Sequence, residues 1–317
     1  MKEIFIHHPY SQSQIPAEEV VLVLGYFDGV HIGHRAVIEK ARAIAEEKGL
    51  KLALMTFNHH PSIVFNKLSF ETMKPLATPV KKGEIMKELG VEIYYVVDFT
   101  SQFARLSPQE FVDQYIVGLH AVEVVTGFDY TFGKADVASV EHFPKYAKNR
   151  FNVTVVAEYV EDGEKVSSTL IRSLLDKGEI EQANHLLGRT YETTGIVVHG
   201  EARGRTLGFP TANIDISRDV RLPRVGVYVN RVKVNGKWYR GMASIGYNDT
   251  FGDNLSLTLE VYILDFDEDI YGEEITVEWI HYIRDMVKFN GIEELIAQLE
   301  SDKRFTLEFD MKDEKLG

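Results

Sequence analysis

The sequence contains no cysteine among its 317 residues. Disulfide bonds, thiol catalysis and cysteine-ligated zinc are therefore excluded. No apolar run approaches the ~20 residues that a membrane-spanning helix needs. Residues 1–9 also lack the apolar core of a signal peptide. We therefore expect a cytoplasmic protein without a membrane partner.

Positive charge is also scarce, because 35 lysines and arginines stand against 48 acidic residues and give a net charge of −13. This balance argues against nucleic acid as the main partner. It does not exclude ATP, since local donors and Mg²⁺ can neutralise phosphates inside an acidic protein. A hydrophobic content of 44% and a charged content of 26% are typical of a globular protein, and the length suits two domains.

The most informative stretch is Gly25–His34, which lies between two apolar segments. The unbroken apolar run Val20–Leu24 predicts a strand buried on both faces. After the stretch, apolar residues recur near helical spacing up to Gly49, which predicts a helix that ends there. Gly25–His34 is therefore predicted to be a strand-to-helix turn at the carboxyl edge of an α/β sheet. Ligands bind at this edge, and a helix N-terminus favours phosphate.

Two histidines in this turn, His31 and His34, are three positions apart and could bring two donors to one phosphate. A zinc site would need a third ligand, and the His-Glu-x-x-His pattern is absent. The alternative is a tight turn with surface histidines. The strand, the glycines and the helix around them favour the phosphate site.

The first part of the chain alternates strands with helices, which indicates a parallel, doubly wound sheet. We predict further strands over 51–57, 93–97, 122–125 and 153–157, and helices over 80–89 and 108–116. Ser107 is expected to cap the second of these helices, with Pro108 at its first position.

Helical periodicity largely disappears beyond Leu187, so we expect two domains, 1–187 and 188–317. The pair Asn235-Gly236 predicts a tight hairpin in the second domain. Several antiparallel strands and one final helix predict a compact β-barrel domain. The strands are expected over 193–199, 225–234, 237–245, 255–264 and 275–283, and the helix over 292–299.

A second polar stretch, Val166–Arg172, contains serines and a threonine that can cap a helix. Arg172 falls in the first turn of that helix, close to its positive end. Taken alone, the stretch predicts an ordinary capped helix with a surface arginine.

A third stretch, Gly204–Asn213, is neither a Walker A loop nor a dinucleotide fingerprint. Its glycines could supply backbone donors to phosphates, and Thr211 and Asn213 could supply two oxygen ligands for Mg²⁺. Ordinary turn chemistry is the alternative. Glu260 lies in an expected strand, where it could simply face solvent. The acidic cluster after it is not a calcium loop, because the glycine required at position six is Ile270.

These stretches carry a resemblance to a known family. Gly25–His34 resembles the G-x-F-D-G-x-H-x-G-H signature of HxGH-type nucleotidyltransferases, in the form used by bacterial bifunctional FAD synthetases. Gly204–Asn213 resembles the riboflavin kinase signature G-R-x-L-G-F-P-T-A-N of the same family. Other segments follow in the family's order: Ala104–Val112, Gly127–Gly133, Val166–Arg172, Ser244–Phe251, Leu259–Gly272 and Ile283–Phe289.

The resemblance implies an α/β fold, with an N-terminal doubly wound nucleotidyltransferase domain and a C-terminal antiparallel β-barrel kinase domain. The first would transfer the adenylyl group of ATP to FMN, giving FAD and pyrophosphate. The resemblance makes His31, His34 and Arg172 catalytic there. It places Gly25, Phe27, Asp28, Gly33, Ser168 and Thr169 against ATP, and Asp129 and Phe132 on the flavin side.

For the second domain the resemblance implies phosphorylation of riboflavin to FMN, with ATP converted to ADP. Glu260 would be the catalytic base, and Thr211 and Asn213 would hold Mg²⁺. Gly204 and Gly208 would contact ATP, and Arg284 would lie near the flavin.

Three departures from the family pattern are present. Lys134–Ser139 replaces a glycine-rich segment, His59 stands where proline is expected, and Asp249 replaces a proline. The first two concern the flavin side of the transferase. Because of these two departures, a riboflavin kinase with a weakened transferase domain is an alternative interpretation of the sequence. A flavin-binding sensor or carrier without chemistry, and transfer to another phosphate acceptor, are further alternatives.

Overall fold

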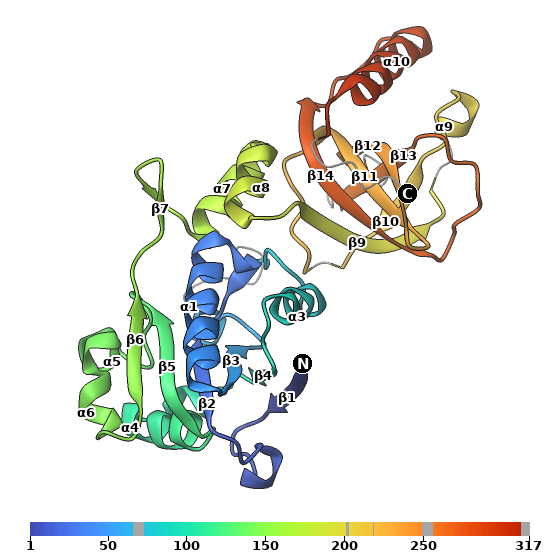
Figure 1. Ribbon diagram of the computed structural model, residues 1–317. Helices are drawn as coiled ribbons and strands as arrows, with labels where there is room; N and C mark the ends of the chain where they lie inside the picture. The colour runs from blue at the N-terminus through green and yellow to red at the C-terminus, as the bar shows by residue number, and fades with distance from the viewer. Residues whose placement is uncertain (66–72, 201–202, 218, 249–255, 312–317) are drawn as a thin grey trace. The chain divides into compact units, whose positions relative to one another are not determined.

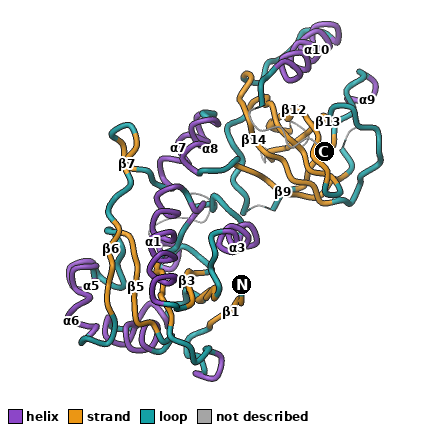
Figure 2. The backbone as a smooth tube through the Cα atoms, viewed as in Figure 1, coloured by secondary structure: helices purple, strands orange, loops and turns teal. Residues whose placement is uncertain are grey.

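A computed structural model describes residues 1–65, 73–200, 203–217, 219–248 and 256–311 (Figure 1). The chain divides into two compact units, Met1–Ser168 and Thr169–Gly317. Each unit is built differently: Figure 2 shows alternating strands and helices in the first and mainly strands in the second.

The first unit contains a six-stranded sheet in the order β1-β4-β3-β2-β5-β6. All neighbouring strands are parallel, and β2 lies inside the sheet between β3 and β5. The strands are β1 (Lys2–Ile6), β2 (Val20–Leu24), β3 (Lys51–Phe57), β4 (Ile93–Val97), β5 (Ala121–Gly127) and β6 (Asn152–Val156). A small antiparallel hairpin follows, β7 (Val160–Glu161) and β8 (Glu164–Lys165).

Both faces of this sheet are covered, which explains the unbroken apolar sequence of β2. Alternate β2 side chains enter two hydrophobic clusters, with Leu22 in one and Val23 in the other. Helices α1 (Ile32–Lys48) and α3 (Pro79–Glu88) contribute to the cluster of Val23. The opposite cluster includes residues of α4 (Pro108–Phe111), the π-helical segment η4 (Val112–Val117) and α6 (Phe143–Ala147). The remaining short helices are η1 (Gln12–Gln14), η2 (Asp28–Val30), α2 (Pro61–Val64), η3 (Phe103–Arg105), α5 (Ala135–Ala138) and η5 (Val140–His142).

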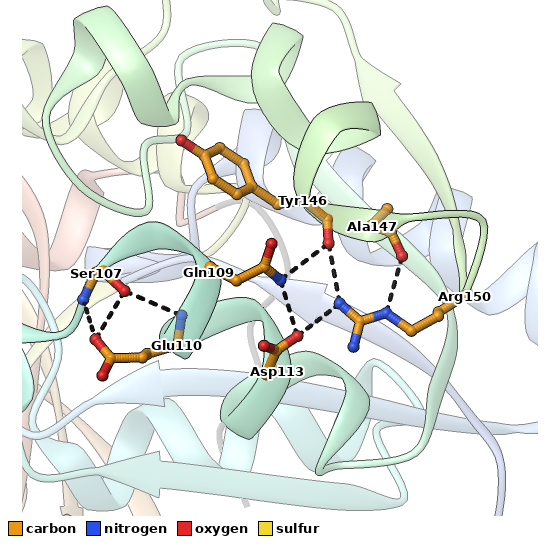
Figure 3. Close-up of polar contacts among 7 residues, drawn as sticks. All are labelled: Ser107, Gln109, Glu110, Asp113, Tyr146, Ala147 and Arg150. Carbon is orange, nitrogen blue, oxygen red and sulfur yellow. Dashed lines mark hydrogen bonds and ion pairs between the residues drawn. The ribbon is translucent and has the colours of Figure 1, made fainter.

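Helix ends in this unit follow local sequence signals. Gly49 ends α1 in the left-handed conformation with a φ of 66°. Ser107 caps α4 through a capping box with Glu110, and the two side chains and their backbone groups bond reciprocally (Figure 3). The same figure shows Arg150 donating to Asp113 at 2.6 Å, which ties the segment after α6 to η4.

The second unit is a closed barrel in the order β10-β13-β12-β11-β14-β9, with antiparallel neighbours throughout. Asn235 and Gly236 both have positive φ, which fits the tight hairpin between β11 and β12. Trp279 fills the interior with no exposed surface and donates to Thr193 at 2.9 Å. The strands are β9 (Tyr191–Val198), β10 (Ala212–Asp215), β11 (Gly226–Val234), β12 (Lys237–Asn248), β13 (Ser256–Ile263) and β14 (Glu274–Arg284).

Four helices belong mainly to the second unit. They are α7 (Ser168–Lys177), α8 (Ile180–Leu187), α9 (Arg203–Thr206) and α10 (Ile292–Glu308). Asn184 on α8 donates to the carbonyl of Trp279 at 2.8 Å and accepts from the Tyr191 amide at 2.7 Å, so α8 is fixed to the barrel.

The predicted fold is confirmed: a doubly wound parallel sheet precedes an antiparallel barrel with a terminal helix. The predicted helix over 108–116 forms as α4 followed by the π-helical segment η4. Four strands lie outside the predicted set: β1, the two strands of the short hairpin β7 and β8, and β10. The final helix extends to Glu308, nine residues beyond the expected end at Leu299.

Candidate active sites

The first candidate site lies at a switch in the strand order. The chain runs from β2 to β3 and β4 on one side of the sheet, whereas β5 and β6 lie on the other. Gly25–His34 follows β2, and the loop Phe128–Gly133 follows the neighbouring strand β5. Both segments therefore leave the carboxyl edge of the sheet at the position where open α/β sheets bind ligands.

The backbone of the turn takes an uncommon path. Phe27 and Val30 have φ values of 55° and 47°, in the left-handed region that a β-branched residue such as valine rarely adopts. Gly25 is required because a Cβ there would lie 2.5 Å from the Phe27 ring. Residues held in such conformations concentrate at functional sites, where the surrounding structure enforces them.

The two histidines of the turn stack on each other. His31 caps α1, and its Nδ1 accepts a hydrogen bond from the backbone N–H of His34 at 3.3 Å. The rings are 3.6 Å apart at an angle of 19°. Gly33 leaves room for this stack, since a Cβ there would lie 3.3 Å from the His31 ring. Among the described residues, Nδ1 of His34 has no hydrogen-bond partner.

Both histidines are held neutral by their surroundings. Burial lowers the pKa of His31 to about 4, while Asp129 raises it and Lys165 lowers it further. Burial, followed by the neighbouring His31 and Lys82, holds the pKa of His34 well below its usual value. At neutral pH the pair therefore offers ring N–H donors without charge of its own.

Asp28 and Ser168 brace the turn. Asp28 is 5% exposed, and its carboxylate accepts a hydrogen bond from the backbone N–H of Leu76 at 2.9 Å. Ser168 donates its hydroxyl to the carbonyl of Asp28 at 3.0 Å. These contacts give both residues a structural role in the turn. Contact of either residue with ATP stays a prediction.

Thr169 and Arg172 follow Ser168 on α7, at the start of the second unit. Thr169 is exposed. Arg172 is 8% exposed, so the expectation of a surface arginine from the helix alone is not met. A buried arginine must be paired, because an uncompensated guanidinium would destabilise the fold.

The loop after β5 places Asp129 and Phe132 in different surroundings. Asp129 is exposed and forms an ion pair with Lys165 of β8 at 2.9 Å. Phe132 is 8% exposed and stacks on Phe143 at a ring distance of 4.3 Å, within the hydrophobic core. A contact of Asp129 or Phe132 with flavin stays a prediction.

The segment that departs from the glycine-rich family pattern folds compactly. Residues 135–138 form the single helical turn α5, and Ala138 is fully buried in the same core as Phe132. The carbonyl of Ala138 accepts from the Phe132 amide at 2.9 Å. The substituted residues therefore reinforce the loop that carries Asp129.

The second candidate site lies on two paired strands of the barrel. Asn213 of β10 is directly opposite Glu260 of β13. Thr211, just before β10, donates its hydroxyl to the Glu260 carboxylate at 3.2 Å. The structure therefore brings the carboxylate of Glu260 next to the oxygen-bearing side chains of Thr211 and Asn213, which lie about 50 positions earlier in the sequence.

Close backbone approach shapes this site. A Cβ on Gly200 would lie 2.2 Å from the Asn213 amide nitrogen, and one on Gly204 would lie 2.2 Å from the carbonyl of Phe209. Gly208 has a φ of 82°, in the region that favours glycine. Gly204 and Gly208 thus allow the chain to turn tightly before Thr211. Contact of either glycine with ATP stays a prediction.

A cavity of about 350 Å³ adjoins Thr211. Its wall includes apolar side chains of β9 and β13 and the acidic segment after β13. Its lining includes Thr211, Val261, Ile263, Phe266, Asp267 and Tyr271. A mostly apolar hollow beside a few convergent polar groups is the usual form of a small-molecule site.

Arg284, the predicted flavin contact at the end of β14, is paired with the terminal helix. Its guanidinium donates to both carboxylate oxygens of Asp302, at 3.1 Å from Nε and 2.6 Å from Nη2. Asp302 is 2% exposed. The flavin contact of Arg284 stays a prediction. Residues 249–251 of the predicted loop Ser244–Phe251, including Asp249, lie outside the described residues.

Two lysines near the first site were not identified from the sequence. Lys165 lies in the β7–β8 hairpin, whose strands are too short to predict, and its importance depends on its pairing with Asp129. Lys82 is buried on α3 beside Ile85 and Met86. A charged residue on the apolar side of a helix is the sequence signal that could have identified it.

Comparison with known proteins supports a two-part architecture. The family model described as FAD synthetase matches residues 13–170, and the one described as riboflavin kinase matches residues 187–309. A protein of Listeria monocytogenes named "Bifunctional riboflavin kinase/FMN adenylyltransferase" is 50% identical over 309 residues, covering 98% of both chains. A Bacillus subtilis protein of the same name is 44% identical over 312 residues, again covering 98% of both.

A crystal structure of a Streptococcus pneumoniae protein, described as a macrolide-efflux protein, is also similar. It is 39% identical, covers 97% of this chain and 100% of its own, and has a TM-score of 0.89. Within the described part of this chain, no helix has the length and apolar character needed to cross a membrane. The two family models and the full-length relatives show that this chain belongs to the family of bifunctional riboflavin kinase/FMN adenylyltransferases.

Proposed function

We propose that the two activities of the family are carried by the two sites described above. Residues 1–187 transfer the adenylyl group of ATP to FMN, and residues 188–317 phosphorylate riboflavin. The product of the second domain is the substrate of the first. One chain would thus convert riboflavin to FAD, consuming two ATP and releasing ADP and pyrophosphate.

In the kinase domain Glu260 is the proposed catalytic base. It accepts the proton of the ribityl 5′-hydroxyl while the oxygen attacks the γ-phosphorus of ATP and the bond to the β-phosphate oxygen breaks. The Thr211 hydroxyl holds one carboxylate oxygen at 3.2 Å and so fixes the orientation of Glu260. Gly204 and Gly208 bring backbone N–H groups toward the phosphates.

The oxygen donors beside Glu260 fit a magnesium ion. Thr211 and Asn213 offer hydroxyl and amide oxygens, the hard ligands that Mg²⁺ prefers, and Gly200 leaves no side chain over the Asn213 amide. Bound there, Mg²⁺ would neutralise charge on the transferring phosphate. We place ATP in the adjoining cavity of about 350 Å³.

In the transferase domain the FMN phosphate attacks the α-phosphorus of ATP, and pyrophosphate leaves. This transfer needs no covalent enzyme intermediate. His31 and His34 donate ring N–H groups to the phosphates, and Arg172 adds positive charge from the helix that Ser168 begins. Thr169, on the same helix, contacts the nucleotide. The pocket for the nucleotide is shaped by Gly25, Phe27, Asp28 and Gly33.

The flavin contacts form the remaining part of this proposal. Asp129 lies on the loop after β5, and its ion pair with Lys165 holds that loop close to His31. Phe132 anchors the same loop in the core, and it would contact the flavin from there. In the kinase domain Arg284 lies at the end of β14, where it would face riboflavin.

The pairing of Glu260 with Thr211 and Asn213 carries this proposal, because a protein that only binds flavin needs no base beside a cation site. The test is substitution Glu260→Gln, assayed by chromatography of flavins with ATP and Mg²⁺. We expect FMN formation from riboflavin to fall by about 10²-fold or more, because the proton acceptor is lost.

Supplied FMN provides the internal control for this variant. Glu260→Gln should convert FMN to FAD at the wild-type rate, since the transferase domain has its own core. Equal loss of both reactions, or unchanged FMN formation, would contradict the division between domains. Wild-type protein that stops at FMN would instead support a weakened transferase, for which the altered segment Lys134–Ser139 is the specific reason.

A further inference from the structure

Lys82 is a buried charged residue that the two proposed reactions do not use. It lies on α3, whose side toward the core also carries Ile85 and Met86. Its side chain points inward, and the residue is 8% exposed. Lysine is rarely buried to this extent unless its ammonium group has specific partners.

The partners of Lys82 come from the turn that follows β2 and from the end of β3. Its Nζ donates to the carbonyl of Tyr26 at 3.1 Å and to Thr56 Oγ1 at 3.2 Å. The ammonium also lies 4.6 Å from the centre of the Tyr26 ring. Thr56, at the end of β3, donates to the same Tyr26 carbonyl at 2.8 Å. Two donors therefore converge on one backbone oxygen in the signature turn.

Further groups face Lys82 from η2 and α1. The carboxylate of Asp28, in η2, attracts the positive charge of Lys82, and the ring of Tyr26 lies against the ammonium group. His34, in α1, lies close enough for Lys82 to lower the pKa of that histidine. His34 itself is neutral at ordinary pH. Burial lowers the pKa of Lys82 to about 8, and Asp28 opposes this shift. Lys82 is therefore mostly protonated at pH 7 and loses its charge above pH 8.

Holding a charge there costs stability. Burial disfavours the ammonium form in the folded state, so between pH 8 and the ordinary lysine pKa the unfolded chain binds more protons. The cost is therefore present at neutral pH and is relieved as the pH rises. An apolar side chain of similar length would usually be neutral or stabilising in such a place. A residue kept against its own stability cost is a candidate for function.

We propose that Lys82 is a positioning residue for adenylyl transfer, which holds the Tyr26 carbonyl and so fixes the turn that presents His31 and His34 to the nucleotide. The turn needs such a constraint because Phe27 and Val30 are in left-handed conformations that relax unless they are held. The ammonium group also adds positive charge beneath two neutral histidines. The inference rests on the proposed transferase site.

The experiment compares Lys82→Met with Lys87→Met, which removes the same charge from an exposed position on the same helix. Lys82→Met should lower kcat for FMN to FAD by about 10- to 100-fold, the usual effect of misplacing catalytic groups by about 1 Å. Riboflavin phosphorylation should be unchanged, and the thermal midpoint should not fall. Lys87→Met should leave both reactions and the midpoint unchanged.

The pH profile separates a positioning role from a merely structural one. Wild-type transfer should decline as the pH rises through about 8 and approach the rate of Lys82→Met, which should show no such decline. Lys82→Arg keeps the charge and should restore part of the rate without that decline. Three results for Lys82→Met would each overturn the inference. These are a transfer rate within twofold of wild type, a lowered thermal midpoint, and a transfer rate that still declines as the pH rises through about 8.

His34→Ala distinguishes failure of this inference from failure of the proposed site. If His34→Ala retains transfer, the site itself is misassigned. If His34→Ala loses transfer while Lys82→Met retains it, the site stands and only the role of Lys82 is wrong.

Discussion

At the scale of single residues, neutrality is the important property of the stacked histidines. A charged imidazole would bind phosphate through charge, whereas His31 and His34 are buried enough to remain uncharged at neutral pH. Their contribution then comes from N–H groups in fixed directions, and positive charge has to come from lysine, arginine and metal ions. Preorganised donors of this kind are effective because they need not reorient during the reaction.

The neutral histidines also predict how stability depends on pH. The folded pKa of His31 is about 4, below that of an unfolded histidine, so the unfolded chain binds more protons between pH 4 and 6.5. Stability of the first unit should therefore be complete above pH 6.5 and fall as the pH is lowered through this window. His31 alone would account for about 3 kcal/mol. Chemical denaturation at several pH values measures this loss.

Substitution His31→Asn is the matched variant for this measurement. Asparagine can also accept a hydrogen bond at a helix N-cap but does not titrate, so the cap is kept while the proton is removed. The slope of stability between pH 4 and 6.5 should become shallower, and His34 should supply what remains. An unchanged slope in His31→Asn would show that this histidine is already charged in the folded state.

At the scale of elements, the ion pair of Arg284 and Asp302 fixes α10 to the barrel. Asp302 is 2% exposed and is also bonded by Gln298, so its carboxylate has few alternatives to arginine. We expect Asp302→Ala to destabilise the second unit by about 3 kcal/mol, since it leaves a partly buried guanidinium without its partner. Denaturation followed by near-ultraviolet circular dichroism or tryptophan fluorescence measures the change.

An exposed acidic residue on the same helix, Glu300, supplies the control. Glu300→Ala removes one negative charge from α10 without breaking the pair, so the stability should change by less than about 0.5 kcal/mol. Equal effects of the two substitutions would indicate that the charge of the helix, and not the contact with Arg284, stabilises it.

Elements with a strong local signal were predictable from the sequence. Val20–Leu24 is apolar throughout, and Gly49 and Asn235-Gly236 mark their turns by chemistry that few other residues share. Strand β10 (Ala212–Asp215) was not predictable, because it begins within Pro210–Asn213, which has the composition of a turn, and it pairs only because β9 and β13 flank it. Strand β1 is short and at an edge, with Phe5 exposed.

In the candidate sites, too, only the residues with a local signal in the sequence were predictable. The spacing of His31 and His34 and the pair Thr211 and Asn213 are visible in the sequence, since each set lies within a few residues. The contact of Lys82 with Tyr26 joins positions 56 residues apart. Its partner is a backbone carbonyl, which carries no sequence signal. Such a contact depends on how α3 packs beside η2, which no local pattern determines.

At the scale of the whole molecule, each unit has its own core, and the proposed transferase site adds Thr169 and Arg172, at the start of the second unit, to residues of the first. The first unit is organised around a parallel sheet and the second around a closed barrel, and the two sites share no residue. If the reactions are independent, FMN released by one domain can be used by any transferase domain in solution. Damage to one site should then leave the other site at its normal rate.

Mixing two damaged proteins tests this account most directly. Glu260→Gln alone should convert riboflavin about 10²-fold more slowly than wild type, and His34→Ala alone should convert riboflavin only to FMN. The mixture is therefore sampled at times when Glu260→Gln alone has formed no detectable FAD. An equimolar mixture with riboflavin, ATP and Mg²⁺ should form FAD, because FMN from one protein reaches the intact transferase of the other. Absence of FAD from the mixture, while Glu260→Gln still converts supplied FMN, would contradict two independent sites joined by a freely diffusing product.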